Sequence, residues 1–582
     1  MGLMITGKEK KTIALVMENI FTDFAHEFIT NVLSGVSARD DIDLVVIAGK
    51  YDGGSDLSDN SYRYRRVYNS IYNLESCCDI DGVIICLGSM AYIDKEQIIA
   101  RFFKGMENVP KVFAIADIEN CVCVNYDNAG GIREAVEYLV NALGVKKICM
   151  LGGREDNPDS VKRKEIFADC LNDNGLSFDE SLYEATDMSM NSIGEARALL
   201  KRNPDVKAVF CVNDATAVAL YNAMEEEGLV PGKDIYVFGF DNTKMAGRMN
   251  PTLASVGAAD VTMGQKAAEL LINMMDGYEV SSELIPTKLY GRESLDYEMY
   301  EYTTKEMQEV DADFIYRMFD DCFYRYRYEM PGSDEVDIRR LFFEFMGRIL
   351  SCMRNRYMSQ EDFEEIKELV DIFFVNGAMN YTDAKKFLKS VDRIQGSINV
   401  SCGPNIFANR LFTHMKDCAI LSISRSLIKE SDKNLRERNM FRYFMVESTN
   451  YDNKSDSFFN NLIQNFDKLG LGNSALYTFE KPVMFDPDKS DLFPETIYLR
   501  CINKNGNLAI LPRERQCGST RKMFNRNMLP GVYSRSVVFP VFYRESIYGF
   551  ILCELTFENI DSGEYVADQL GRAIFLGGAD NE

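Results

Sequence analysis

The chain has 582 residues and a formal net charge of −24 at pH 7, with 65 lysines and arginines against 89 aspartates and glutamates. This length predicts three or four domains, each large enough for its own core. The acidic balance disfavours nucleic acid and anionic membranes as partners. The sequence shows neither a secretory leader nor an uninterrupted apolar stretch of about 20 residues, which predicts a cytoplasmic protein without a membrane span.

The 15 cysteines predict no disulfide framework. Cys86, Cys149 and Cys211 stand inside apolar runs, where a free thiol behaves as a small hydrophobic group. The chain has no Cys-x-x-Cys pair, and its only histidines, His26 and His414, lie far apart in the sequence. We therefore expect reduced thiols, no zinc-type cluster and no cofactor.

From residue 11 to about 290, short apolar runs alternate with amphipathic helical patterns. Such runs, joined by helices, predict a parallel sheet with right-handed crossovers, in which ligands bind beyond the carboxyl ends of the strands. Polar residues at five of these ends predict a cleft, although each residue alone could be a helix cap or turn residue; Asp214 is interpreted as the N-cap of helix 214–228. The residues at these ends are Asn19, Ser89, Asp117, Asn213 with Asp214, and Asp241.

Several motifs then occur in order: "VNYDNAGGIREAVEYLVNALGVKKICMLGG", "VFGFDNTKMAGRMNPTLASVGAADVTMGQKAAELL" and "IPTKLYGRESL". They resemble the effector-binding core of the lac-repressor (LacI/GalR) family over about 11–295. The resemblance implies an α/β periplasmic-binding-protein type I fold with two lobes, and ligand bound between them. It also implies the boundaries: lobe one at about 11–124 and 258–284, and lobe two at about 125–255 and 285–295. A hinged pair of lobes is a switch, because a ligand that contacts both favours the closed state.

The resemblance also implies ligand contacts in lobe two. Asp241 matches an acidic position that accepts hydrogen bonds from ligand hydroxyls. Asn213 matches an amide that both donates to and accepts from the ligand. Arg163 matches an arginine that reaches the cleft from a helix; the alternative is a solvated residue beside Lys162 and Lys164.

The predicted site is completed by residues of lobe one and by two positions at which the chain departs from the family pattern. Asn19, Phe21 and Phe24 fall in the loop where the family packs ligand on apolar and aromatic groups, and Phe24 could equally be a core residue. Met188 and Asp260 stand where family members often place aromatic rings, and the chain contains no tryptophan. A pocket with more carboxylate and less aromatic surface disfavours a plain hexose and leaves a polyol, an amine-bearing compound or a nucleoside.

Members of the family also have a DNA-binding part. They carry a helix-turn-helix before the first strand, whereas ten residues precede Lys11 here. Together with the negative charge, this predicts no direct DNA binding.

The second half of the chain changes character. Residues 300–447 carry helical patterns, ending in a long helix that we expect to serve dimerisation, so this region is predicted to be all-α. Residues 448–582 alternate strand and helix patterns, and "VVFPVFYRESIYGFILCEL" resembles the closing hairpin of a GAF domain. That resemblance implies an α+β domain that relays a signal or binds a small molecule.

We find no catalytic motif and expect no enzymatic activity in this chain. The leading hypothesis is a cytosolic homodimeric sensor that binds a small polar ligand and signals to an output domain or partner on its C-terminal side. One alternative is the regulatory input half of a diguanylate cyclase or kinase. The other is an interaction scaffold with a vestigial cleft.

Overall fold

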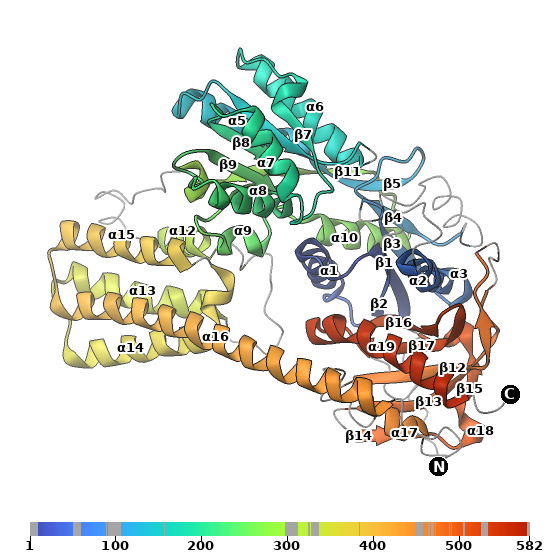
Figure 1. The fold of residues 1–582 in the computed structure, drawn as a ribbon. Helices are drawn as coiled ribbons and strands as arrows, with labels where there is room; N and C mark the ends of the chain where they lie inside the picture. The colour runs from blue at the N-terminus through green and yellow to red at the C-terminus, as the bar shows by residue number, and fades with distance from the viewer. Residues whose placement is uncertain are drawn as a thin grey trace.

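The structure is a computed structural model, and Figure 1 shows its ribbon. The described residues are 10–50, 60–88, 90, 106, 108–155, 157–296, 312–323, 326, 337–382, 384–448, 458–463, 466, 469, 471, 473–487, 489, 492–504, 507–524 and 534–578.

Lobe one is built on a parallel sheet of order β2-β1-β3-β4-β5. Its strands are apolar and almost wholly buried, as expected for a sheet covered on both faces. Helices α1 and α10 pack against each other, and α10 also contacts β3, β4 and β5. The elements are β1 (Lys11–Glu18), α1 (Asp23–Val36), β2 (Ile42–Gly49), α2 (Asn60–Tyr68), α3 (Leu74–Cys77), β3 (Gly82–Cys86), β4 (Lys111–Ala114), β5 (Val122–Asp127) and α10 (Met263–Met275).

Lobe two is also built on a parallel sheet, with strands in the order β7-β6-β8-β9-β10. The last strand, β11 (Glu283–Tyr290), joins the lobes: its first half runs parallel to β5 and its second half antiparallel to β10. The other elements are α5 (Asn128–Glu137), β6 (Ile148–Gly152), α6 (Pro158–Asp173), β7 (Tyr183–Ala185), α7 (Ile193–Arg202), β8 (Ala208–Cys211), α8 (Asp214–Glu226), β9 (Tyr236–Phe240), α9 (Lys244–Arg248) and β10 (Ala254–Ala258). The expectation of an α/β fold with parallel strands in the first half is confirmed.

The expected helical region follows. Its helices pack around an aromatic core that includes Phe342, Phe345 and Phe373, with ring centroids 5.2 to 6.0 Å apart. The elements are α12 (Ala312–Cys322), α13 (Ile338–Arg354), α14 (Gln360–Val375), α15 (Ala384–Cys402) and the first part of α16 (Ile406–Glu447). We call these helices, up to about residue 419 of α16, the helical bundle.

The C-terminal unit is an antiparallel sheet of order β13-β12-β17-β16, with β14 and β15 both paired to β13. The outer edge of β16 pairs in parallel with β2 of lobe one, from Arg535 opposite Leu44 to Val538 opposite Ile47. One sheet therefore runs from the C-terminal unit into lobe one, and their apolar cores merge. The elements are α17 (Phe458–Ile463), β12 (Asn473–Met484), β13 (Thr496–Lys504), β14 (Asn507–Ala509), α18 (Arg513–Gln516), β15 (Cys517–Ser519), β16 (Arg535–Tyr543), β17 (Ser546–Glu554) and α19 (Phe557–Gly578).

Helix α16 spans the distance between the helical bundle and the C-terminal unit (Figure 1). Near its end, Phe444 is buried in the core shared by lobe one and the C-terminal unit. The side-chain amide of Gln569 in α19 donates to the carbonyl of Met445, 3.1 Å away. The bundle in turn contacts lobe two, because Lys385 forms an ion pair of 3.1 Å with Glu293. None of the described helices is long and apolar enough to cross a membrane.

Candidate functional site between the lobes

Asp241 follows β9 directly, at the carboxyl edge of the lobe-two sheet. Its φ is +97° and that of Asn242 is +50°, two consecutive residues in a region that non-glycine residues seldom adopt. The backbone N–H of Asp241 donates to the carbonyl of Val256 at 2.8 Å, and that of Asn242 donates to Ser255 Oγ at 3.0 Å. Unfavourable backbone held in place by its surroundings is typical of functional sites.

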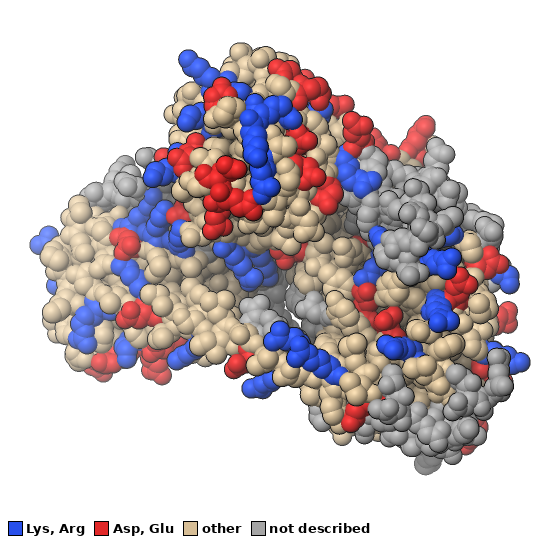
Figure 2. All heavy atoms as spheres, in the orientation of Figure 1, with Lys and Arg blue, Asp and Glu red and all other residues tan. Residues whose placement is uncertain are grey.

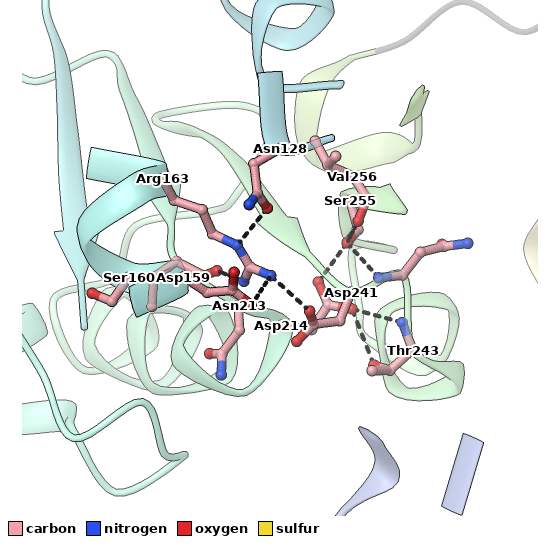
Figure 3. A network of polar contacts seen from close by, with 12 residues as sticks. Asn128, Asp159, Ser160, Arg163, Asn213, Asp214, Asp241, Thr243, Ser255 and Val256 are labelled. Carbon is pink, nitrogen blue, oxygen red and sulfur yellow. Dashed lines mark hydrogen bonds and ion pairs between the residues drawn. The ribbon is translucent and has the colours of Figure 1, made fainter. Parts of the chain in front are cut away.

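The guanidinium of Arg163, on α6, lies against this strand end (Figure 3). It is 3.5 Å from Asp241 Oδ1 and 3.7 Å from Asp159 Oδ2, and its Cζ lies 3.6 Å from the centroid of the Phe240 ring. It also donates to Asn128 Oδ1 at 3.2 Å and to the carbonyl of Val212 at 2.7 Å. Arg163 is only 3% exposed, so the alternative of a solvated helix residue is wrong.

Charge and burial oppose each other at Asp241. Burial raises the pKa of the Asp241 carboxyl, and the nearby Arg163 guanidinium acts in the opposite direction. The pKa of Tyr126 is also raised, first by burial and then by the negative charges of Asp241 and Glu27. Asp159 and Asp241 place two carboxylates around one guanidinium, which favours ligands rich in hydrogen-bond donors.

Asp214 belongs to the same network, and its predicted role as the N-cap of helix 214–228 is wrong. Helix α8 begins at Asp214, and its N-cap is Asn213, whose Oδ1 accepts from the Thr216 N–H at 2.8 Å. The Asp214 side chain turns inward instead, where it accepts from the Thr243 N–H at 2.7 Å and from Ser255 Oγ at 2.6 Å. Burial, followed by the negative charge of Asp241, raises the pKa of Asp214 to about 7.

Asn213 and Met188 are brought together. The Asn213 side-chain amide donates to the carbonyl of Met188 at 3.1 Å. Met188 has φ +64°, and its side chain packs over Gly153. Part of the hydrogen-bonding capacity of Asn213 is therefore used within the protein, which limits what it can offer a ligand.

The two lobes meet through a hydrogen bond close to this network. Glu27 Oε1, on α1 of lobe one, accepts from the backbone N–H of Lys244, at the start of α9 in lobe two, at 2.8 Å. Since Glu27 also acts electrostatically on Tyr126, the lobe contact and the Asp241 network share one neighbourhood.

The remaining predicted residues lie mainly in or beside lobe one. Asn19 has φ +49° and is exposed, while Phe21 lies 4.8 Å from Lys50 Nζ and Phe24 stacks on Phe28 at 5.9 Å. Asp117 and Asp260 are exposed loop residues. Ser89 falls outside the described residues.

Sequence reasoning missed Asn128, Asp159 and the inward role of Asp214. Asp159 precedes Arg163 by four residues, so helical spacing could have paired them. Asn128 and Ser255 gave no comparable signal, because they approach Arg163 and Asp214 only through tertiary contacts.

The chain is similar to several known proteins. The model of the periplasmic binding protein-like domain family matches residues 136–295. CelR, an HTH-type transcriptional regulator of Thermobifida fusca, is 31% identical over 174 residues, 29% of this chain and 51% of CelR. ExuR, a probable HTH-type transcriptional repressor of Bacillus subtilis, is 26% identical over 284 residues, 48% of this chain and 78% of ExuR. The solved CelR–cellobiose complex is 24% identical and covers 49% of this chain and 85% of that chain, with a TM-score of 0.41.

Residues 136–295 therefore resemble a periplasmic binding protein-like domain, and up to about half of the chain is similar in sequence to HTH-type transcriptional regulators. The chain spans about half the length of CelR and 78% of ExuR. The family model covers residues 136–295, and the GAF-like interpretation of the C-terminal unit stays a prediction.

Proposed function

We propose that this protein is a ligand-sensing regulator that binds a small polar molecule between its two lobes and acts by binding, without catalysis. The observation that carries the proposal is the buried Arg163–Asp241 pair, which lies at the carboxyl edge of the lobe-two sheet beside the lobe contact. Ligands of open parallel sheets bind at this edge. Similarity to transcriptional regulators of the LacI/GalR type supports a regulatory role.

The ligand class follows from the groups that surround the pair. The two carboxylates can accept hydrogen bonds from hydroxyl or amine groups, and the guanidinium can donate to an oxygen. Sugars, uronates, polyols and nucleosides carry such groups. The buried Phe240 ring is already covered by Arg163, so we expect recognition by hydrogen bonding more than by stacking.

The connections of α16 suggest how lobe closure is transmitted. One end of α16 is fixed to the helical bundle, which contacts lobe two, and the other end is fixed to the C-terminal unit, which shares a sheet with lobe one. The two lobes are therefore linked twice: through their crossover strands and through α16. Movement of one lobe relative to the other must bend, shift or release α16.

The output of such a movement belongs to a partner or to another domain. We propose that α16 and the C-terminal unit transmit the movement to this output. In one finer version of the proposal, the C-terminal unit is a GAF-like relay domain. In another, the chain is the regulatory input half of a diguanylate cyclase or kinase. A homodimer fits the exposed apolar residues along the middle of α16, which include Leu421, Ile428 and Leu435 at seven-residue spacing.

Thermal shift with a library of sugars, uronates, polyols and nucleosides tests the proposal directly. A ligand that binds only the folded lobes raises the Tm in proportion to the logarithm of its concentration. We expect at least one class to do so, and Asp241→Ala to abolish the shift. If no compound stabilised the protein, the scaffold with a vestigial cleft would be the better description. A shift that survived Asp241→Ala would show that the site assignment is wrong.

A further inference from the structure

A second group of chemically active side chains lies outside the site between the lobes. Asp371 on α14 and His414 and Cys418 on α16 converge. His414 Nε2 is 2.7 Å from Asp371 Oδ1, and Cys418 Sγ is 3.4 Å from His414 Nε2 and 3.5 Å from Asp371 Oδ1. All three residues are half-buried. His414 and Cys418 are four residues apart, so one helix face presents both.

These separations are close to those between the ligand atoms of a tetrahedral zinc site. Bond lengths of about 2.3 Å to sulfur and about 2.0 to 2.1 Å to nitrogen or oxygen place sulfur about 3.6 Å from the other ligand atoms. The two distances from Cys418 Sγ already approach this value. Only the distance between His414 Nε2 and Asp371 Oδ1, now 2.7 Å because the two atoms share a hydrogen bond, must increase, to about 3.4 Å.

The same geometry argues against a nucleophile–base–acid relay. A relay needs the thiol and the carboxylate on opposite ring nitrogens, so that the histidine passes a proton from one to the other. Here both approach Nε2, and Cys418 Sγ is farther from Nδ1, at 4.0 Å. Three ligand atoms that converge on one point suit a cation.

The cluster also lines a cavity of about 910 Å³ between lobe two, the helical bundle and the middle of α16. Figure 2 shows a hollow in this region, with Lys and Arg side chains gathered around it. The basic residues that line the cavity are Arg248, Lys385, Arg425 and Lys429. Such a lining favours an anionic group beside the cluster.

We propose that Asp371, His414 and Cys418 bind a zinc-class divalent transition metal, with a fourth coordination position open to the cavity. Mixed nitrogen, sulfur and oxygen ligands suit Zn²⁺, and three protein ligands plus an open position are typical of reactive or ligand-binding metal sites. The basic lining gives a small anion access to that position. The metal would also tie α14 to α16, the helix that links the two lobes.

Binding requires the loss of the Cys418 thiol proton. Burial and the adjacent Asp371 carboxylate raise the pKa of this thiol to about 12 without metal. On binding, the S–H bond breaks, a sulfur–metal bond forms and the proton passes to solvent, with no change of oxidation state.

Cobalt(II) is the probe for this site because a Co²⁺–thiolate bond absorbs in the near ultraviolet. The reduced, chelator-treated full chain should bind one Co²⁺ with this absorption, and Zn²⁺ should displace it. Cys418→Ser should abolish the absorption, and His414→Ala should abolish stoichiometric binding. Circular dichroism should show that both variants keep the wild-type helix content.

Two matched variants serve as controls. Cys402→Ser removes a half-buried thiol from the same bundle, and His26→Gln removes the other histidine of the chain; both should bind Co²⁺ like the wild type. No charge-transfer absorption in the wild type, or its persistence in Cys418→Ser, would overturn the site. Added inorganic phosphate should shift the visible Co²⁺ bands, and an unchanged spectrum would overturn the open position.

Discussion

Glu27 and Lys244 join the two lobes: the Glu27 carboxylate accepts a hydrogen bond of 2.8 Å from the Lys244 backbone N–H. This contact lies beside the Asp241 network, because Glu27 and Asp241 both act on Tyr126. A hydrogen bond to a charged acceptor contributes about 1.5 to 3 kcal/mol. Its loss is therefore large enough to move a balance between open and closed lobes.

Glu27→Ala should shift the protein toward the open arrangement. Without the acceptor, the Lys244 N–H exchanges its partner for water, and we expect a larger radius of gyration by small-angle X-ray scattering. A ligand that requires closure should bind about tenfold more weakly, which corresponds to about 1.4 kcal/mol. Asp40→Ala, which removes an exposed carboxylate from the same lobe, should leave both measurements unchanged. An unaltered radius and affinity in Glu27→Ala would contradict a role in closure.

Arg163→Met should lower the stability of lobe two. The substitution leaves the Asp241 and Asp159 carboxylates without their shared cation, and removing one partner of a buried pair costs about 3 to 5 kcal/mol. Adding Asp241→Asn should recover part of the loss, because it removes one unpaired charge. Thermal unfolding of the two single variants and the double variant measures this coupling. Strict additivity would show that the two side chains do not interact.

Asp214→Asn should change how stability depends on pH. The pKa of Asp214 is raised to about 7, whereas an unfolded aspartate titrates near about 3.9. Between these values the folded chain holds more protons than the unfolded chain, so the contribution of Asp214 to stability falls as pH rises, by about 1.4 kcal/mol per unit. Relative to wild type, Asp214→Asn should gain in Tm from pH 5 to pH 7.5.

An exposed aspartate of lobe two provides the control for this pH profile. Asp205 is exposed, and its hydrogen bond with Lys147 lowers its pKa. Asp205→Asn therefore removes no carboxyl group whose pKa is raised. Its Tm should follow the wild-type profile over the window from pH 5 to pH 7.5. Parallel profiles for wild type and Asp214→Asn would show that Asp214 does not titrate there.

Glu293→Gln should uncouple lobe two from the bundle without disturbing the ligand site. Glu293 pairs with Lys385 at 3.1 Å and with Lys389 at 3.3 Å, and its neutral form would lose both pairs. We expect ligand affinity to stay within about threefold of wild type while the ligand-dependent change in hydrogen exchange along α16 is reduced. Glu368→Gln, an exposed position on α14, is the control. An undiminished response in Glu293→Gln would place the coupling elsewhere.

Ile428→Glu should dissociate the proposed dimer. Ile428 is 62% exposed and lies between Leu421 and Leu435, which are 51% and 49% exposed, so a charge there would enter an apolar seam. Light scattering after size exclusion should report a dimer for wild type and a monomer for the variant. Arg436→Glu alters charge on another face of α16 and should remain dimeric. A monomeric wild type would contradict the proposal.

Periodicity and composition were enough to predict the α/β first half, the helical region after it and the strand ends at which Asn213 and Asp241 stand. These features depend on local patterns, since buried parallel strands are continuously apolar and helices repeat every 3.6 residues. The resemblance to the LacI/GalR family, and not the periodicity, added Arg163 as a candidate and supported Asp241. Their roles as ligand contacts stay predictions.

Only the tertiary structure decided which of these residues meet. The Asn128–Arg163 contact, the inward turn of Asp214, the β2–β16 pairing and the approach of Asp371 to His414 all join segments far apart in the chain. No local pattern encodes such contacts, because they follow from how whole elements pack. His414 and Cys418 carry a helical four-residue spacing in the sequence, but a ligand cluster emerges only when α14 brings Asp371 beside them.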